Sequence, residues 1–510
     1  MQINNSVSKE TLNGLIENSA LKIAELYRTL KVNLAVRSLM DEHTPQLYIL
    51  SQDIQNGIKF ILMDISVSYK AEFSIDNPYE KRFFMKNIQA SISEGYKLLF
   101  NFGKQRKKSL WKKLITKVRE EGCENLINEA AEIDKKLKVF GDTKINQDLR
   151  NITLHYDKEM IEVYKKTLSV DSEDKVIQMV SEFGRLLQDI LLFTDHIDDY
   201  CLKTTGMDKI YPSLSGKLEV NSKHKEVCDI INKNGELENI LKNIIQKEVG
   251  NIDSTAGYWL STKRLEEYIQ RSSLTIDPFS EISNIQGLTN IQLLLKFMLL
   301  DIAAITDAYL KSSSNIEYAL NLRRVCVTKV STMVHLYGYT PDEQEHSIWN
   351  KIEKMIPADS YDLIKNADSI RIILGKIVEG TQDKDLRATF VHLFNNSKSC
   401  TDIAQVIKAI EEIDPIKQIV EILFILEIYK TLMNFTKKLM NILAQNIHKE
   451  KLQSTKFLND KIDELICKFE NSPLPDTYKT RFLSIIKEMK TKVNDLKINL
   501  HRYGRHNINT

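Results

Sequence analysis

Apolar residues recur every three or four positions along almost the whole chain, as in Leu12, Leu15, Ile16 and Ile23. This spacing is typical of amphipathic α-helices, and the alternating pattern of a β-strand is scarce. Turn-forming residues interrupt it at 76–78, 141–142, 205–216, 340–341, 356–357 and 471–475. The pattern therefore predicts an all-α fold made of helix groups that these turns separate.

Two windows are especially apolar, 293–305 and 416–433, and both contain charged residues such as Lys296, Asp301 and Glu421. Neither is an uncharged run of about 18 residues, the length needed to span a bilayer. We expect both windows to form buried helices and the chain to have no membrane partner.

An internal repeat runs through the chain. Lys59-Phe-Ile-Leu-Met-Asp-Ile65 returns as Lys296-Phe-Met-Leu-Leu-Asp-Ile302, with five identities in seven positions at an offset of 237. Ser109-Leu-Trp111 matches Ser347-Ile-Trp349 at 238, and Phe193-Thr194 matches Phe435-Thr436 at 242. Self-similarity held at a nearly fixed offset indicates a duplicated unit.

The repeat sets the expected domain organisation. We expect two similar helical bundles, copy 1 at residues 1–205 and copy 2 at 246–445, joined by a connector at 206–245 and followed by a helical tail at 446–510. Two related units offer each other the same self-complementary face, so the simplest packing is an internal pseudo-dimer.

Each copy carries one carboxylate inside an apolar helix, Asp64 in copy 1 and Asp301 in copy 2. A buried carboxylate is costly unless a charged group pairs with it. The sequence therefore predicts a partner for each, with Arg150 and Arg387 as candidates, and a supporting role for both carboxylates near a functional site.

Both copies also carry an Arg followed five positions later by a His. Arg150-Asn-Ile-Thr-Leu-His155 and Arg387-Ala-Thr-Phe-Val-His392 stand at the repeat offset. One interpretation is a structural Arg and a core His inherited together. The other is a composite site in a groove, because five residues advance by about 500° on a helix and keep Arg and His off one face. Two imidazoles can serve as acid and base on a phosphodiester, and guanidinium groups can hold its charge.

With these motifs the chain resembles the HEPN superfamily of helical bundles. Its ribonuclease members carry Arg, usually a polar residue, three variable residues and His, and dimerise so that two motifs form one RNA-cleaving cleft. Arg150, Asn151 and His155 match this pattern, whereas Ala388 replaces the usual polar residue in copy 2. A subgroup has a Tyr two residues after the His, where this chain has Asp157 and Phe394, so its regulation by adenylylation is not carried over.

The resemblance implies a metal-independent endoribonuclease without a cofactor, acting as a toxin or antiviral-defence effector. It implies that the catalytic residues are Arg150, Asn151, His155, Arg387 and His392.

The charge of the chain limits where RNA could bind. The 71 Lys+Arg and 69 Asp+Glu nearly cancel, so RNA would need a local basic patch. The densest basic stretch, residues 104–113, fits a solvated helix face as well as it fits RNA binding. The corresponding segment of copy 2, residues 341–346, is acidic, so we expect RNA to lie nearer copy 1. The candidate RNA-binding residues are Lys104, Arg106, Lys107, Lys108, Lys112 and Lys113.

Several features bear on compartment and metal. Six cysteines without C-x-x-C spacing favour free thiols, and the first residues lack the pattern of a secretory signal, so we expect a cytoplasmic protein. Residues 195–199 contain metal-ligand types, but the corresponding positions of copy 2 include Lys437 and Lys438, and we expect no metal.

The alternative function is a non-catalytic helical scaffold or immunity protein that binds RNA or a protein partner. An antitoxin or sensor protein is a further possible partner, and the chain is expected to be a monomer with an internal pseudo-dimer or a higher homo-oligomer. Convergence of Arg150, His155, Arg387 and His392 on one cleft favours catalysis, and burial of each pair in its own bundle favours the scaffold.

Overall fold

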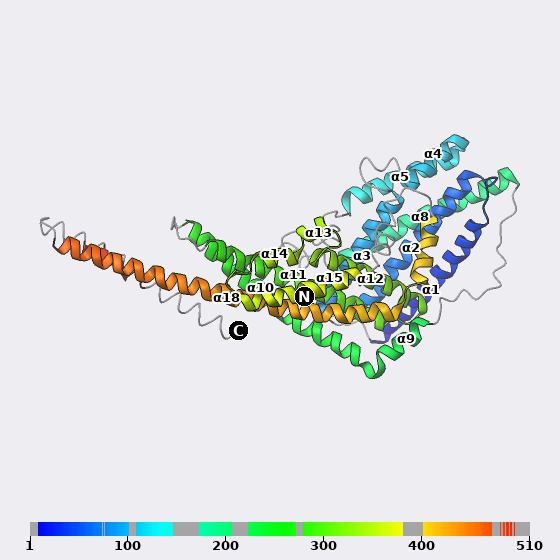
Figure 1. The fold of residues 1–510 in the computed structure, drawn as a ribbon. Coiled ribbons are helices and arrows are strands. Elements are labelled where there is room, and N and C mark those ends of the chain that lie inside the picture. The colour runs from blue at the N-terminus through cyan, green and yellow to red at the C-terminus, as the bar shows by residue number, and fades with distance from the viewer. Residues whose placement is uncertain are drawn as a thin grey trace. The chain divides into compact units, whose positions relative to one another are not determined.

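The computed structural model is helical, with no strand among the residues that it describes, and this confirms the all-α fold (Figure 1). It describes residues 9–73, 75, 77–100, 109–145, 173–206, 223–271, 279–380 and 401–471, together with scattered positions between 480 and 494. The described α-helices are α1 (Lys9–Ser38), α2 (Gln46–Phe73), α3 (Pro78–Leu99), α4 (Leu110–Glu121), α5 (Glu124–Thr143), α8 (Glu173–Thr205), α9 (Lys223–Ile231), α10 (Glu236–Arg271), α11 (Phe279–Leu310), α12 (Asn315–Leu336), α13 (Pro341–Glu345), α14 (Ile348–Lys354), α15 (Tyr361–Gly380), α17 (Thr401–Glu411) and α18 (Pro415–Glu470).

Helix bounds recur at the offset found in the sequence. Both ends of α3 and α12, and both ends of α5 and α15, are 237 residues apart, and α2 and α11 end 237 residues apart. The starts of α8 and α18 differ by 242. Secondary structure therefore repeats together with sequence. The domain boundaries stay a prediction, and the one expected at 445 falls inside α18, which Figure 1 draws as a single long helix.

The same side-chain cap begins one helix in each copy. Ser109 accepts a hydrogen bond from the backbone N–H of Lys112 at 3.2 Å, and Ser347 accepts one from the N–H of Asn350 at 3.1 Å. Such caps satisfy a backbone donor that has no partner in the first helical turn. Trp111 and Trp349, two residues further on, are both buried, as expected for core positions.

An aromatic cluster holds α3, α4, α5 and α8 together. Trp111 packs edge-on against Phe193 with ring centroids 5.6 Å apart, and its Nε1 donates to Asp134 at 3.1 Å. The Tyr96 hydroxyl donates to the Leu137 carbonyl at 3.0 Å and lies where a Cβ at Gly141 would collide with it. The break predicted at 141–142 lies within two residues of the end of α5 at Thr143, and Gly141 also permits the close approach of Tyr96.

The chain divides into two compact units that do not follow its linear order. Unit 1 comprises Met1–Ile252, Lys296–Asn350 and Ile372–Glu427, and unit 2 comprises Asp253–Leu295, Lys351–Arg371 and Ile428–Thr510. In the described part of the chain, one segment, Ser283–Leu310 of α11, is long and apolar enough to cross a membrane, and 83% of its most apolar window is buried in the protein. Core helices pass the same test, and the predicted buried helix at 293–305 is confirmed.

The second apolar window, 416–433, was expected to be buried and is only partly so. One side of α18 packs inward through residues such as Ile419 and Ile422. The other side leaves Ile416, Val420 and Phe424 exposed to 54%, 45% and 64%. The window is therefore an amphipathic helix whose outer side is also apolar, which its composition did not reveal.

Candidate functional site

Most of the predicted catalytic and RNA-binding residues lie outside the part of the chain that the structure describes. The two motifs fall within segments 146–172 and 381–400, which follow α5 and α15. The residues concerned are Arg150, Asn151, His155, Arg387, His392, Lys104, Arg106, Lys107 and Lys108.

Lys112 and Lys113 belong to the predicted basic stretch and are described. Lys112 lies in the first turn of α4 and forms an ion pair with Asp134 of α5 at 2.9 Å, while Lys113 is exposed. Asp134 neutralises one of the positive charges expected to attract RNA. This position contributes less to a basic surface than the sequence suggested.

Asp64 on α2 lies in a buried charge cluster. Arg323 and Arg324 of α12 donate to its Oδ1 at 3.0 and 2.9 Å, and Ser91 of α3 donates to its Oδ2 at 2.8 Å. Burial opposes the charge of Asp64, but Arg324, Arg323 and Ser91 outweigh it and lower its pKa to about 2. The Arg323 guanidinium also lies 5.2 Å from the centroid of the Phe60 ring. Asp64 is therefore a permanently charged anchor between α2 and α12.

Asp301 on α11 has the equivalent partner from the other copy. Lys86 of α3 approaches Asp301 Oδ2 at 3.7 Å, and both residues are buried. Lys86 and Arg323 are themselves 237 residues apart, as are Asp64 and Asp301. The two contacts are therefore reciprocal: an acid of copy 1 contacts a base of copy 2, and the equivalent acid of copy 2 contacts the equivalent base of copy 1.

A second exchanged set involves Lys70 and Glu80 of copy 1 and their equivalents Asp307 and Glu317 of copy 2. The buried ammonium group of Lys70 binds Glu317 and lies 2.5 Å from Ser313 Oγ. We call Lys70, Ser313 and Glu317 the closed corner, because opposite charges meet in it.

The matching set brings two carboxylates together, because the position of Lys70 is occupied by Asp307 in copy 2. We call Glu80 and Asp307 the acidic corner. Burial, followed by the charge of Asp307, raises the pKa of Glu80 to about 7, and burial also raises the pKa of Asp307. Lys311 binds Asp307 Oδ2 at 2.5 Å, but Glu80 Oε1 and Asp307 Oδ1 are buried without a hydrogen-bond partner among the described residues.

These contacts revise the partners expected for the two shared carboxylates. The sequence suggested Arg150 and Arg387, which lie outside the described residues. The partners that the structure describes are Arg323 and Arg324 for Asp64, and Lys86 for Asp301. Lys86 and Arg323 share a charge at the repeat offset, and this signal in the sequence could have identified them.

Residues 195–199 of α8, considered above for metal binding, are engaged with protein groups. Asp198 accepts hydrogen bonds from Ser51 at 2.7 Å, Gln52 at 2.7 Å and Gln55 at 2.9 Å, and burial raises its pKa to about 6 against these bonds. His196 Nδ1 lies 3.0 Å from Glu129 Oε2. No group of three or more metal-ligating side chains occurs among the residues the structure describes.

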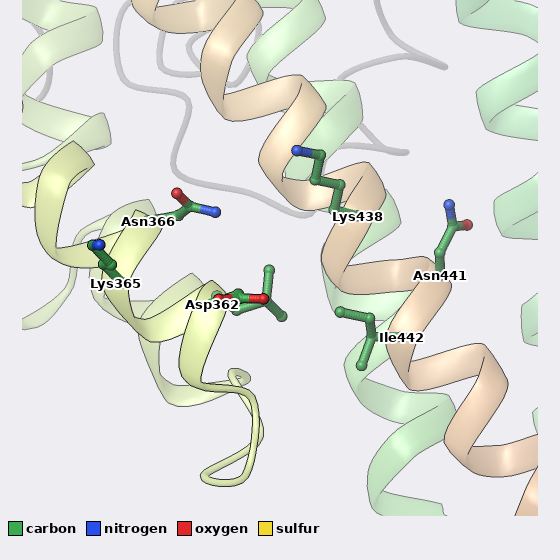
Figure 2. Close-up of a pocket in the computed structure, with 7 residues that line it drawn as sticks. Asp362, Lys365, Asn366, Lys438, Asn441 and Ile442 are labelled. Atoms are coloured by element: carbon green, nitrogen blue, oxygen red, sulfur yellow. The ribbon is translucent and has the colours of Figure 1, made fainter.

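An open groove of about 620 Å³ lies between α15 and α18 within unit 2. Figure 2 shows Asn366 and Lys438 extending from the two helices toward the space between them, with Asp362 and Ile442 beside it. Leu363, Lys365 and Asn441 complete the lining. Asn366, Lys438 and Asp362 therefore face the groove, while Figure 2 shows Lys365 and Asn441 at its rim and not directed into the space between the helices.

Comparisons with protein families, with curated proteins and with solved structures gave no match for this chain. The function is therefore argued from its own residues.

Proposed function

We propose that the protein is a metal-independent endoribonuclease of the HEPN type. Its composite site comprises Arg150 and His155 of copy 1 and Arg387 and His392 of copy 2. The observation that carries the proposal is the duplication of the Arg and His motif in register with a repeat that extends to the helix bounds. Arg150 and Arg387 each follow the end of an equivalent helix, α5 or α15, by seven residues.

The pseudo-dimer is part of the proposal, because each copy supplies only half of the site. It is supported by the exchanged contacts of Asp64 with Arg323 and of Lys86 with Asp301. An isologous contact pairs the same two positions twice, once in each direction, and these contacts follow that rule.

The proposed reaction needs only protein groups. One imidazole takes the proton of a ribose 2′-hydroxyl, whose oxygen attacks the adjacent phosphorus. The other imidazole donates a proton to the departing 5′-oxygen, leaving a 2′,3′-cyclic phosphate and a 5′-hydroxyl end. Arg150 and Arg387 hold the phosphate oxygens through charge-assisted hydrogen bonds.

The test is RNA cleavage by the purified full chain in excess chelator, with analysis of the product ends. His155→Ala and His392→Ala should each lower the rate by roughly 10²–10⁴, the usual contribution of a general acid or base. His43→Ala, at an exposed His of copy 1, is the matched control and should cleave like the parent. Undiminished cleavage by both motif variants would contradict the proposed mechanism.

Asn151 and Ala388 test whether the half-sites are equal. Asn151→Ala should slow cleavage more than Ala388→Asn changes it, because Asn151 alone supplies the polar side chain usual at this position. Equal effects would show that the position has no role in the reaction.

A non-catalytic scaffold is the second candidate. The observation that favours it is the burial of Asp64 and Asp301 in ion pairs between helices, which is a structural role. A parent chain that binds RNA without cleaving it in any condition would support this function.

Toxin or defence activity is a further part of the first proposal, and it predicts that His155→Ala relieves any growth arrest caused by expression.

A further inference from the structure

The groove between α15 and α18 differs in charge from the equivalent surface of copy 1. Asn366 and Lys438 occupy the positions of Glu129 and His196, according to the repeat offsets of 237 and 242. In copy 1 these two side chains are in polar contact, with 3.0 Å between His196 Nδ1 and Glu129 Oε2. In copy 2 the corresponding side chains are an amide and a lysine, so no carboxylate at this position neutralises the Lys438 ammonium group.

Three neighbouring positions change in the same sense, while Asp362 replaces the neutral Asn125 in the opposite sense. Lys437 and Asn441 of copy 2 replace Asp195 and Asp199 of copy 1, and Lys365 replaces Asn128. A surface with several carboxylates in copy 1 thus becomes one with three lysines in copy 2. Exposed charges attract or repel ions over about 8–10 Å at moderate salt, so this change reverses the preference of the surface from cations to anions.

The two lysines that line the groove are available to a ligand. Lys365 and Lys438 are exposed, and neither forms an ion pair with another residue that the structure describes. An ammonium group is a compact charge with three donors, well suited to phosphate oxygens. Asn366 and Asn441 add amide donors along the α15 and α18 sides.

Asp362 restricts the ligand further. Its carboxylate lines the groove from the first turn of α15 and can only accept hydrogen bonds when ionised. A bare phosphate is an anion at neutral pH and is repelled by the charge of this carboxylate. A ribose 2′-hydroxyl can donate to it while the adjacent phosphate binds the lysines, and this hydroxyl is the group that distinguishes RNA from DNA.

We infer that the groove between α15 and α18 binds the sugar–phosphate backbone of single-stranded RNA, with one phosphate on Lys438, another on Lys365 at the rim and a 2′-hydroxyl on Asp362. The inference rests on the proposed function only for the choice of RNA as the ligand. It assigns copy 2 an RNA contact of its own, whereas the sequence pointed to copy 1.

The test measures binding of a labelled single-stranded RNA to the full chain by fluorescence anisotropy, in chelator and in the His155→Ala background to prevent cleavage. Lys365→Ala/Lys438→Ala should weaken binding roughly tenfold or more, and the slope of log affinity against log salt should fall by about 0.7 for each phosphate that a lysine no longer neutralises. The matched control is Lys376→Ala/Lys456→Ala, which removes exposed lysines of α15 and α18 outside the groove and should change affinity less.

A second variant tests the groove without removing either lysine. Asn366→Glu introduces the residue that pairs with His196 in copy 1, so it should engage Lys438 and weaken RNA binding. Asp362→Asn should reduce the preference for RNA over DNA of the same sequence. Inorganic phosphate should compete only weakly in the same assay.

Each outcome separates this inference from the proposed function. Unchanged affinity and salt slope in the double lysine variant, or equal affinity for RNA and DNA in the parent, overturns the RNA groove whether or not the chain cleaves RNA. Binding that depends on the groove in a parent chain that never cleaves RNA supports the inference and contradicts the nuclease.

Discussion

The closed and acidic corners are related by the repeat offset, and Lys70 of the first corresponds to Asp307 of the second. Lys70 faces Glu317 in the first, while Asp307 faces Glu80 in the second. Both corners are buried, so the exchange of a lysine for an aspartate changes an attraction into a repulsion that Lys311 relieves only in part. The repeat thus keeps the bounds of helices more strictly than the charges at their contacts. A duplicated position can acquire a new electrostatic role while its backbone stays the same.

Removing the acid of the closed corner should have the largest effect. Glu317→Gln leaves the Lys70 ammonium buried without its counter-charge, which should lower the free energy of unfolding by about 3–5 kcal/mol. Chemical denaturation followed by circular dichroism measures this loss. The double variant Lys70→Met/Glu317→Gln should recover part of it, because neither charge then remains. A loss well below 1 kcal/mol in the single variant would show that water reaches the corner.

The matching change in the acidic corner should have the opposite sign. Because the folded pKa of Glu80 is about 7 and thus above its unfolded value, the folded protein keeps a proton that the unfolded chain releases. Stability should therefore fall as pH rises from about 4.5 through about 7 and then level off. Glu80→Gln should remove the contribution of Glu80 to this dependence, leaving those of Asp198 and Asp307, and raise the free energy of unfolding above pH 7 by about 1–3 kcal/mol.

The measurement is the unfolding midpoint of parent and Glu80→Gln between pH 5 and 8. Lys242 and Glu238 of α10 also act on this corner, together with Lys311, so a parallel Lys242→Met series separates their contribution. A parent whose stability rises steadily over this interval would contradict the assignment of a protonated Glu80.

The exposed pair between Lys112 and Asp134 should show the smallest effect. Both side chains are about one-third or more exposed, at 33% and 42%, and solvent screens their attraction. Lys112→Ala should lower the free energy of unfolding by only about 0.2–1 kcal/mol, as is usual for surface ion pairs. The same denaturation assay measures this loss. A loss as large as that of Glu317→Gln would show that burial does not determine how much an ion pair contributes to the stability of this protein.

Periodicity was sufficient to predict the all-α class, and the repeat offset predicted which helices share their bounds. The spacing of apolar residues required helices, and the segments that match at an offset of 237 lie on helices that match in the structure. The need of Asp64 and Asp301 for partners also followed from the sequence, since a charge in an apolar helix cannot stay unpaired. The break expected at 141–142 lies within two residues of the end of α5, but the contact of Gly141 with Tyr96 did not follow from the sequence.

The partners themselves were decided by tertiary structure. Asp64 and Arg323 are 259 residues apart, and only the packing of α2 against α12 brings them within 3.0 Å. The opposite charge preferences of the groove and of its copy 1 equivalent also required the fold, because Glu129 and His196 come from different helices. Sequence by itself determined the helices, their duplication and the paired Arg and His motifs, since these depend on local spacing. Which charges meet, and which lysines remain open to a ligand, depends on contacts between distant segments.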